Sequence, residues 1–343
     1  MPRRCTMVME PCVAREGVIG ERENDVHHPE VLFEITDRCH LDCIFCSTDA
    51  CAEKNTFLDK RFIFTILEEL ETTGTGVVQL SGGEPFLHPD ILELVNAILR
   101  RGFVLEIYSS GTGPREAPIP ASLLRGMNRG DQISIRYNLQ SPCKKTHSAL
   151  TRHERAFQNV LASIANTVQA GIPAEVHFLP TTMNASDFTS LVTLCERLGV
   201  SKLKVLRFVP QGRGALHQDL LLSVNQLRAF QNTVLDGVSC GGLAVDVGKS
   251  FSLPGVGGCK KCLAGIKKHV IDCNRNLFPC AGLKQLPSFS TRCEASYLES
   301  VHSPGFDRVM AKLNDTRRRM KHVPPHLGGC AAQFSWDGTR QMD

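Results

Sequence analysis

Three cysteines stand close together near the start of the chain, in the segment TDRCHLDCIFC. Cys39, Cys43 and Cys46 have C-x3-C-x2-C spacing and follow a strand-like run. Thiolates on such a loop can converge on one face of an iron–sulfur cube. Three ligands for four irons leave one iron open, and an open position on a metal centre usually receives a substrate or a cofactor. The alternatives are a zinc site completed by His40 or Asp37, or three unrelated buried cysteines.

The composition bounds the setting of this chemistry. Fifteen cysteines in 343 residues are unusual, and the basic start MPRRCTMVMEPC is not followed by the apolar core of an export signal. No run reaches the roughly 18 apolar residues of a membrane span. We therefore expect a reducing, cytoplasmic setting, in which clustered cysteines bind metal or do redox chemistry. The net charge of +4 is too small to indicate a nucleic-acid partner.

Alternating strands and helices must position the cysteines. Strand-like segments occupy residues 31–36, 76–81, 103–110, 132–139, 174–180 and 202–210. Helical segments occupy residues 59–74, 88–102, 153–170, 186–198, 224–236 and 306–320. Six strands separated by helices predict a parallel α/β sheet. Periodicity alone leaves open whether this sheet forms a full barrel, a partial barrel or an open sheet.

Two motifs resemble those of the radical SAM superfamily. CHLDCIFC is similar to its cluster-binding motif, and LSGGEPFLHPD is similar to its GGE motif. The resemblance covers about residues 30–240 and implies a partial (β/α)6 barrel of parallel strands. It also implies that Cys39, Cys43 and Cys46 bind a [4Fe–4S] cluster whose open iron is chelated by S-adenosylmethionine. Reductive cleavage of that cofactor gives a 5′-deoxyadenosyl radical, which abstracts a hydrogen atom from substrate.

The resemblance assigns cofactor contacts as well. Gly82, Gly83 and Glu84 stand where the superfamily meets the amino group of the cofactor's methionine. Glycines let the backbone approach closely, and a carboxylate suits an ammonium group. Phe45 corresponds to the aromatic residue beside the adenine. The segments YSSGTG and ISIRYNLQ resemble the regions that supply the remaining expected contacts, which are Ser109, Ser110, Thr112, Ser134 and Asn138.

The C-terminal cysteines resemble an auxiliary-cluster module. The pattern C-x2-C-x17-C and the segment LGGCAAQ are similar to the opening and the end of SPASM and twitch modules. The resemblance implies one auxiliary [4Fe–4S] cluster, with structural zinc as the alternative. Its expected ligands are Cys259, Cys262, Cys280 and Cys330, with Cys273 as an alternative. We therefore predict an N-terminal arm (1–29), the barrel (30–240) and a Cys-rich module that includes a helix and a tail (241–343).

Four polar residues on the predicted strands are catalytic candidates. Alternation along the fourth strand groups Ser134, Arg136 and Asn138 on one face, and alternation along the fifth groups Glu175 and His177. If these faces point into the barrel, the side chains line the cavity, and otherwise they are hydrogen-bonded residues at its rim. Arg136 stands where many members of the superfamily have an acidic residue. The candidates are Arg136, Glu175, His177 and Arg207.

The predicted function is that of an iron–sulfur-dependent radical SAM enzyme of oxidoreductase type. SPASM-like modules are common in enzymes that oxidise or cross-link ribosomally synthesised peptides, and a peptide is therefore the expected substrate. The alternative is dehydrogenation or rearrangement of a sugar, cyclitol or nucleotide in antibiotic or cofactor biosynthesis, as in the GTP-cyclising enzyme of molybdenum-cofactor biosynthesis. A non-catalytic iron–sulfur carrier would not need a GGE motif. An external electron donor such as flavodoxin or ferredoxin is the other expected partner.

Overall fold

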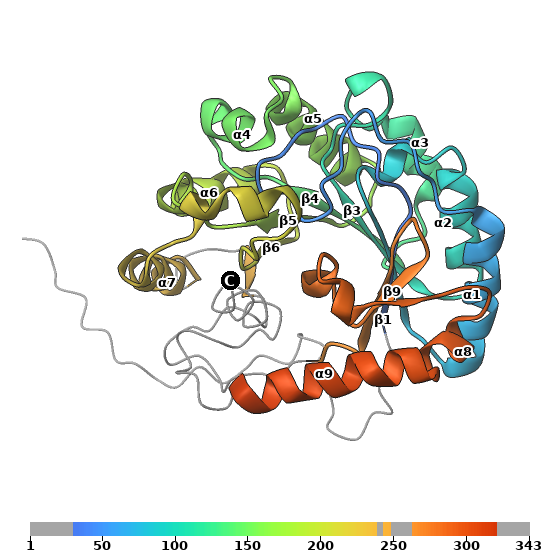
Figure 1. The fold of residues 1–343 in the computed structure, drawn as a ribbon. Helices are drawn as coiled ribbons and strands as arrows, with labels where there is room; N and C mark the ends of the chain where they lie inside the picture. Colours follow the sequence, from blue (N-terminus) through green and yellow to red (C-terminus); the bar gives the residue numbers. More distant parts are fainter. Residues whose placement is uncertain (1–29, 239–242, 248–262, 321–343) are drawn as a thin grey trace, which may run out of the picture.

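One curved sheet forms the centre of the structure, which is a computed structural model that describes residues 30–238, 243–247 and 263–320 (Figure 1). The strand order is β10-β9-β8-β1-β2-β3-β4-β5-β6-β7. The strands are β1 (Glu30–Glu34), β2 (Val77–Ser81), β3 (Val104–Ser109), β4 (Ile133–Asn138), β5 (Ala174–Phe178), β6 (Lys202–Val205), β7 (Ala244–Val247), β8 (Lys268–Ile271), β9 (Asn276–Phe278) and β10 (Thr291–Arg292). β7 and β10 are the two edge strands and do not pair with each other in the described residues, and the barrel is therefore partial.

Helices cover the outer side of this sheet (Figure 1). They are α1 (Lys60–Thr73), α2 (Ile91–Arg100), α3 (Ala121–Met127), α4 (Lys144–Thr151), α5 (Ala156–Gln169), α6 (Phe188–Arg197), α7 (Val224–Val238), α8 (Tyr297–Val301) and α9 (Pro304–Met320). Local signals set their ends: Asp59 caps α1 by accepting from the Arg61 and Phe62 N–H groups, and Gly74 ends it at φ 66°. The predicted parallel α/β architecture is confirmed, whereas the sequence did not predict the short helices α3, α4 and α8.

Alternation along the strands separates the core from the interior of the barrel. On β4, Ile133, Ile135 and Tyr137 are buried in the hydrophobic core. The Tyr137 hydroxyl lies 2.7 Å from Thr167 Oγ1 of α5, on the helix side of the sheet. Side chains at the intervening positions, such as Arg136, therefore point into the barrel.

The C-terminal segment extends the barrel sheet. β8 pairs in parallel with β1, so that Glu30 lies opposite Lys268, and β9 and β10 continue the sheet as antiparallel strands. This part of the chain therefore shares the sheet of the barrel. The predicted arm (1–29) and the boundary near residue 240 lie outside the described residues, and the division into three parts remains a prediction. Among the described helices, none is long and apolar enough to span a membrane.

Candidate functional site

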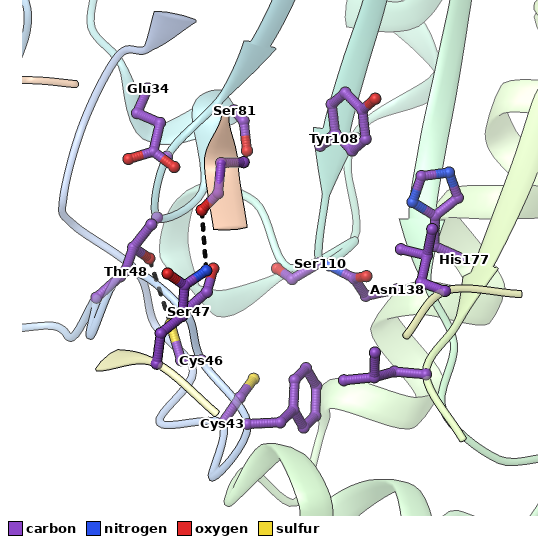
Figure 2. Close-up of a pocket in the computed structure, with 18 of the residues that line it drawn as sticks. Glu34, Cys43, Cys46, Ser47, Thr48, Ser81, Tyr108, Ser110, Asn138 and His177 are labelled. Atoms are coloured by element: carbon purple, nitrogen blue, oxygen red, sulfur yellow. Dashed lines mark hydrogen bonds between the residues drawn. The ribbon is translucent and has the colours of Figure 1, made fainter. Parts of the chain in front are cut away.

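A cavity of about 350 Å³ opens at the carboxyl ends of the parallel strands (Figure 2). Ser81 at the end of β2, Asn138 at the end of β4 and His177 on β5 line it. Loop residues that follow β1, β3 and β6 form more of its wall, and residues 281, 282 and 284 of the C-terminal segment contribute to it. Parallel α/β folds bind their ligands at this edge of the sheet, which makes the cavity the candidate functional site.

Three thiols line this cavity, those of Cys39, Cys43 and Cys46. They lie on the loop between β1 and α1, where the Cys46 N–H donates to the Cys43 carbonyl oxygen (3.1 Å). The Cys39 Sγ accepts a hydrogen bond from the Leu41 N–H (3.4 Å), and the Cys46 Sγ lies 3.3 Å from Thr48 Oγ1. The loop thus turns all three sulfur atoms toward one space and gives two of them hydrogen-bonding neighbours.

The thiols fit an iron–sulfur cluster on electrostatic grounds. Burial raises the pKa of Cys39 and of Cys43, and neighbouring thiolates raise both further. Three thiolates together in this wall therefore need a positive group between them, which the irons of a cluster supply. Within the described residues, no group of three His, Cys, Asp or Glu side chains has the geometry to hold one metal ion. The thiolates of a cube each bind a separate iron.

A double-glycine turn after β2 packs directly on the cysteine loop. The Gly83 N–H donates to the Thr36 carbonyl oxygen (2.6 Å), and the Glu84 N–H donates to that of Arg38 (2.8 Å). Gly82 has φ +134°, and a Cβ on it would lie 2.2 Å from the Thr36 oxygen. Only glycine fits this close approach, so the two motifs that are separate in the sequence form one surface of the cavity.

Glu84 has a different environment from its two glycine neighbours. Its side chain is fully buried and is not among those that line the cavity. The carboxylate accepts bonds from the Ser109 and Ser110 hydroxyls and from the Ser110 N–H (2.8 Å). Burial raises the pKa of Glu84, while these hydrogen bonds lower it in part. In this structure the carboxylate therefore ties the turn after β2 to the turn after β3, behind the cavity wall.

The other predicted cofactor contacts divide into two groups. Those that line the cavity with Gly82 and Gly83 are Phe45, Ser109, Ser110 and Asn138. Thr112 and Ser134 do not line it. Thr112 is buried and accepts from Asn159 Nδ2 (3.4 Å), and Ser134 lies lower on β4, opposite Glu106. The roles assigned to all these residues remain proposals.

Arg136 and Glu175 form an ion-pair network inside the barrel. Arg136 makes two short bonds to the Glu106 carboxylate, and its Nε donates to Glu175 Oε2 (2.9 Å). Its Nη1 also donates to the Tyr108 hydroxyl (2.6 Å). Arg136, Glu106 and Glu175 do not line the cavity, whereas Tyr108 does. The network therefore supports a cavity residue from behind.

His177 does line the cavity, beside the Tyr108 ring (Figure 2). The two rings meet edge to face, with centroids 5.3 Å apart. The Nε2 atom of His177 is buried and has no hydrogen-bond partner among the described residues. Burial, and then the positive charge of Arg136, lower the pKa of His177 well below its usual value. The imidazole is therefore neutral and presents a free nitrogen. Arg207, the fourth catalytic candidate, also lines the cavity.

Sequence reasoning missed an ion pair in the cavity wall. Lys284, from the C-terminal segment, pairs with Glu34 on β1, and both side chains are less than a tenth exposed. The same segment contacts the cysteine loop, because Gln285 Nε2 donates to the Ser47 carbonyl oxygen (3.4 Å). Alternation on β1 could have identified Glu34 as facing the interior, whereas nothing in the sequence near Lys284 indicates its partner.

Only part of the predicted auxiliary ligand set can be placed. Cys259, Cys262 and Cys330 lie outside the described residues. Cys280 opens a short turn whose next two residues line the cavity. Cys273 follows β8 and is half-buried, and burial, with the negative charge of Asp37, raises its pKa to about 12. Both described candidates therefore lie on the side of the barrel where β8 joins β1.

The partial barrel, the three-thiol loop and the glycine turn define a class of protein, namely iron–sulfur enzymes that bind a cofactor beside an open iron. Residues 33–195 match the family model described as Radical SAM superfamily. The chain therefore contains a radical SAM domain, and this family implies a [4Fe–4S] cluster and S-adenosylmethionine.

Two curated proteins are similar to the chain over different lengths. The probable GTP 3′,8-cyclase of Saccharolobus islandicus is 26% identical over 192 residues, which are 54% of this chain and 60% of that protein. The mycofactocin maturase MftC of Mycobacterium ulcerans is 24% identical over 332 residues, which are 94% of this chain and 85% of that protein. The chain thus spans less than two thirds of the cyclase and most of the maturase.

Solved structures share the fold. SuiB of Streptococcus suis bound to S-adenosylmethionine has a TM-score of 0.64 at 17% identity, over 78% of this chain and 63% of SuiB. SuiB bound to its precursor peptide SuiA has a TM-score of 0.63 at 17% identity, over 78% of this chain and 62% of SuiB. At such identity the likeness shows the radical SAM barrel fold alone.

Replacing Gly83 with alanine is expected to push the glycine turn off the cysteine loop. The added Cβ would lie 2.1 Å from the Arg38 carbonyl oxygen, which is a backbone atom. We expect S-adenosylmethionine cleavage to slow about a hundredfold, as for a displacement of about 1 Å in a site. Gly76→Ala is the matched control, because a Cβ there meets nothing within 4 Å. Equal cleavage rates in the two variants would contradict the prediction.

Proposed function

We propose that this enzyme oxidises or cross-links a ribosomally synthesised peptide by abstracting a hydrogen atom from it. The observation that carries this proposal is the extent of the similarity to the mycofactocin maturase, which covers 94% of this chain. The similarity to the GTP cyclase covers 54%. SuiB, which shares the fold, has been crystallised with a precursor peptide. These findings favour a peptide over a nucleotide.

The cofactor end of the cavity is proposed to lie at the cysteine loop. Cys39, Cys43 and Cys46 would hold the cluster, and Gly82 and Gly83, which line the same cavity, would contact the methionine part of S-adenosylmethionine. Together these cofactors supply a 5′-deoxyadenosyl radical that takes a hydrogen atom from substrate. The protein must orient the reactants and keep water and oxygen out. Apolar side chains of the wall serve this purpose, and they are Phe45, Leu179, Leu206, Phe208 and Val209.

The substrate end is proposed to lie deeper in the barrel. Tyr108 and His177 are side by side there, and Asn138 lies beside His177 across the sheet. A peptide brings amide groups that need hydrogen bonds when they leave water. The neutral His177 ring can satisfy one of them through its free Nε2, and Arg136 fixes the Tyr108 hydroxyl beside it. His177 is therefore proposed to bind the substrate rather than to accept its proton.

An auxiliary [4Fe–4S] cluster is proposed in the C-terminal module (241–343). Cys259, Cys262, Cys280 and Cys330 would bind it, with Cys273 as the alternative fourth ligand. The position of Cys280 supports this proposal, because its next two residues line the cavity. A cluster there would accept the electron of a substrate radical as the substrate releases a proton to solvent. An external donor such as flavodoxin or ferredoxin would supply the electron for each cleavage.

A deuterium-transfer experiment tests the peptide proposal. The enzyme, reconstituted with iron and sulfide without oxygen, is given S-adenosylmethionine, a reductant and a precursor peptide with deuterated side chains. We expect one deuterium in the 5′-deoxyadenosine and a peptide that has lost two hydrogen atoms per turnover. Precursor peptides encoded beside the gene are the ones to use. Deuterium transfer from GTP or from a cyclitol, with none from any such peptide, would contradict the proposal.

Cys280→Ser separates the two clusters in the same assay. The hydroxyl keeps the contact to the Gly282 N–H, which the Cys280 Sγ accepts at 3.4 Å. We expect the iron content to fall from about eight to about four atoms per chain, with 5′-deoxyadenosine still formed and the oxidised peptide lost. Unchanged iron in this variant, or zinc in the purified protein, would contradict the auxiliary cluster.

A further inference from the structure

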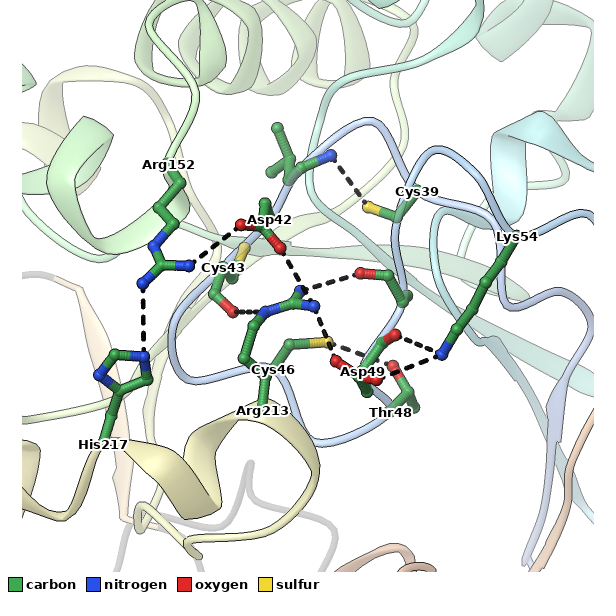
Figure 3. A network of polar contacts seen from close by, with 12 residues as sticks. Cys39, Asp42, Cys43, Cys46, Thr48, Asp49, Lys54, Arg152, Arg213 and His217 are labelled. Carbon is green, nitrogen blue, oxygen red and sulfur yellow. Dashed lines mark hydrogen bonds and ion pairs between the residues drawn. The ribbon is translucent and has the colours of Figure 1, made fainter.

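One arginine that the cofactor assignments do not use contacts the cysteine loop at four points (Figure 3). Arg213 Nε donates to the Cys43 carbonyl oxygen (2.8 Å), and Nη2 donates to that of Ala50 (2.9 Å). Its Nη1 contacts Asp49 Oδ1 (2.8 Å) and Asp42 Oδ1 (3.1 Å). The side chain is 11% exposed. A planar guanidinium can hold this many acceptors in fixed directions, whereas an ammonium group cannot.

The backbone around Arg213 is built for this contact. Arg213 belongs to a short 3-10 helix, Gly212–Leu216, in the loop after β6. Gly212 has φ +57°, and a Cβ on it would lie 2.7 Å from the carbonyl oxygens of both Cys46 and Ser47. The Gly214 N–H donates to the same Cys46 oxygen (3.3 Å). The segment therefore packs against the loop, and only glycine at position 212 permits that distance.

The charges around the loop need this cation. Asp42 and Asp49 flank the segment that carries Cys43 and Cys46, and Arg213 contacts both carboxylates. A [4Fe–4S] cluster with three thiolate ligands is negative, and its reduction adds one more electron. A nearby positive charge favours the reduced state. Without Arg213, Asp42 and Asp49 would keep only the more exposed cations Arg152 (3.2 Å) and Lys54 (3.4 Å) as partners.

We infer that Arg213 is a positioning residue for the cluster of the radical SAM site: it holds the cysteine loop closed and raises the reduction potential of the cluster. The inference rests on the assignment of that cluster to Cys39, Cys43 and Cys46. It does not depend on the peptide substrate, because the potential is measured without any substrate.

Arg152, at the end of α4, offers a matched control. Its Nη1 contacts Asp42 Oδ2 (3.2 Å), so that it shares a carboxylate partner with Arg213. Its side chain is 47% exposed and contacts the cysteine loop at that carboxylate, while its Nη2 lies 3.5 Å from His217 Nε2 outside the loop. Arg152→Met thus removes the same charge near the same aspartate and leaves the Cys43 and Ala50 carbonyl bonds in place. A difference between the two arginine variants then belongs to the Arg213 contacts.

The test compares wild type, Arg213→Met, Arg213→Lys and Arg152→Met after reconstitution with iron and sulfide. The midpoint potential is measured by redox titration with EPR detection, and iron loss to a chelator is followed over time. For Arg213→Met we expect the equilibrium constant for reduction to fall about tenfold, which is 59 mV for a one-electron couple. Arg213→Lys should keep the potential near that of wild type but lose iron faster. Its ammonium group keeps the positive charge but cannot make all the contacts of the guanidinium. Arg152→Met should match wild type in midpoint potential and in the rate of iron loss.

Two results would overturn the inference. One is a potential of Arg213→Met equal to that of Arg152→Met, and the other is iron loss from Arg213→Lys as slow as from wild type. If Arg213→Met binds no cluster while Arg152→Met does, loop closure by Arg213 is supported, and Arg213→Lys decides the charge effect. In that case, a tenfold fall in the equilibrium constant for reduction of Arg213→Lys would exclude a role for the positive charge.

Discussion

Changing Cys39, Cys43 and Cys46 to alanine is expected to abolish formation of 5′-deoxyadenosine. All three thiols line the cavity at the carboxyl ends of the strands, on the loop that packs against the glycine turn. Without these three ligands the cluster would not bind, and S-adenosylmethionine would lose the centre that reduces it. We expect cleavage below about a thousandth of the wild-type rate, measured by chromatography of 5′-deoxyadenosine with dithionite as reductant.

Cys51→Ala is the control for this experiment. Cys51 lies on the same loop and is half-buried, but it is not among the residues that line the cavity. Its backbone oxygen accepts from the Cys39 N–H (3.0 Å), and alanine keeps that bond. The control should bind iron and cleave S-adenosylmethionine like wild type. Cleavage that survives in the triple variant, or that is lost equally in Cys51→Ala, would refute the cluster assignment.

The sequence predicted that the cysteine loop and the glycine turn lie at one edge of the sheet, because local patterns determine this placement. Strand and helix periodicity located β1 and β2, and parallel strands bring their carboxyl ends to one edge. The cysteine loop and the glycine turn follow these two strands and had to meet there. The close approach of Gly83 to the Arg38 oxygen explains why the turn needs glycine, which the sequence alone indicates only as a motif.

The parts that were not predicted depend on long-range pairing. The pairing of Glu30 with Lys268 joins segments from opposite ends of the chain, and no local pattern in either strand encodes it. The same pairing brings Lys284 to Glu34 in the cavity wall. Burial likewise cannot be read from a motif. Glu84 carries the expected residue type, but its carboxylate is directed at the Ser109 and Ser110 turn behind the wall.

Alternation grouped Arg136 with the residues that face into the barrel, yet its neighbours determine what it does. Each adjacent strand places a carboxylate beside it, Glu106 on β3 and Glu175 on β5. Register across three strands creates this arrangement, because Tyr108 lies opposite Arg136, and Arg136 lies opposite Glu175. A positive residue at this point of β4 therefore balances two negative ones and supports Tyr108 in the cavity wall.

Replacing Arg136 with methionine is expected to reduce the free energy of unfolding by about 3–5 kcal/mol, because two largely buried carboxylates lose the Arg136 cation. The three side chains are 10%, 15% and 9% exposed, and solvent can compensate little of this loss. Gln79 Nε2 still donates to Glu106 (2.6 Å) and Lys202 to Glu175 (3.3 Å), which favours the lower end of the range. The change in the free energy of unfolding is measured by urea titration with detection by circular dichroism.

Two further variants decide whether unpaired charge is the cause of that loss. Lys60→Met breaks an ion pair with Asp90 and Glu93 whose side chains are 33–49% exposed, and it should destabilise the protein far less than Arg136→Met does. Arg136→Met combined with Glu106→Gln and Glu175→Gln should recover most of the lost stability, because no buried carboxylate is then left without a cation. If the triple variant is as unstable as Arg136→Met alone, packing around the guanidinium rather than its charge maintains this part of the barrel.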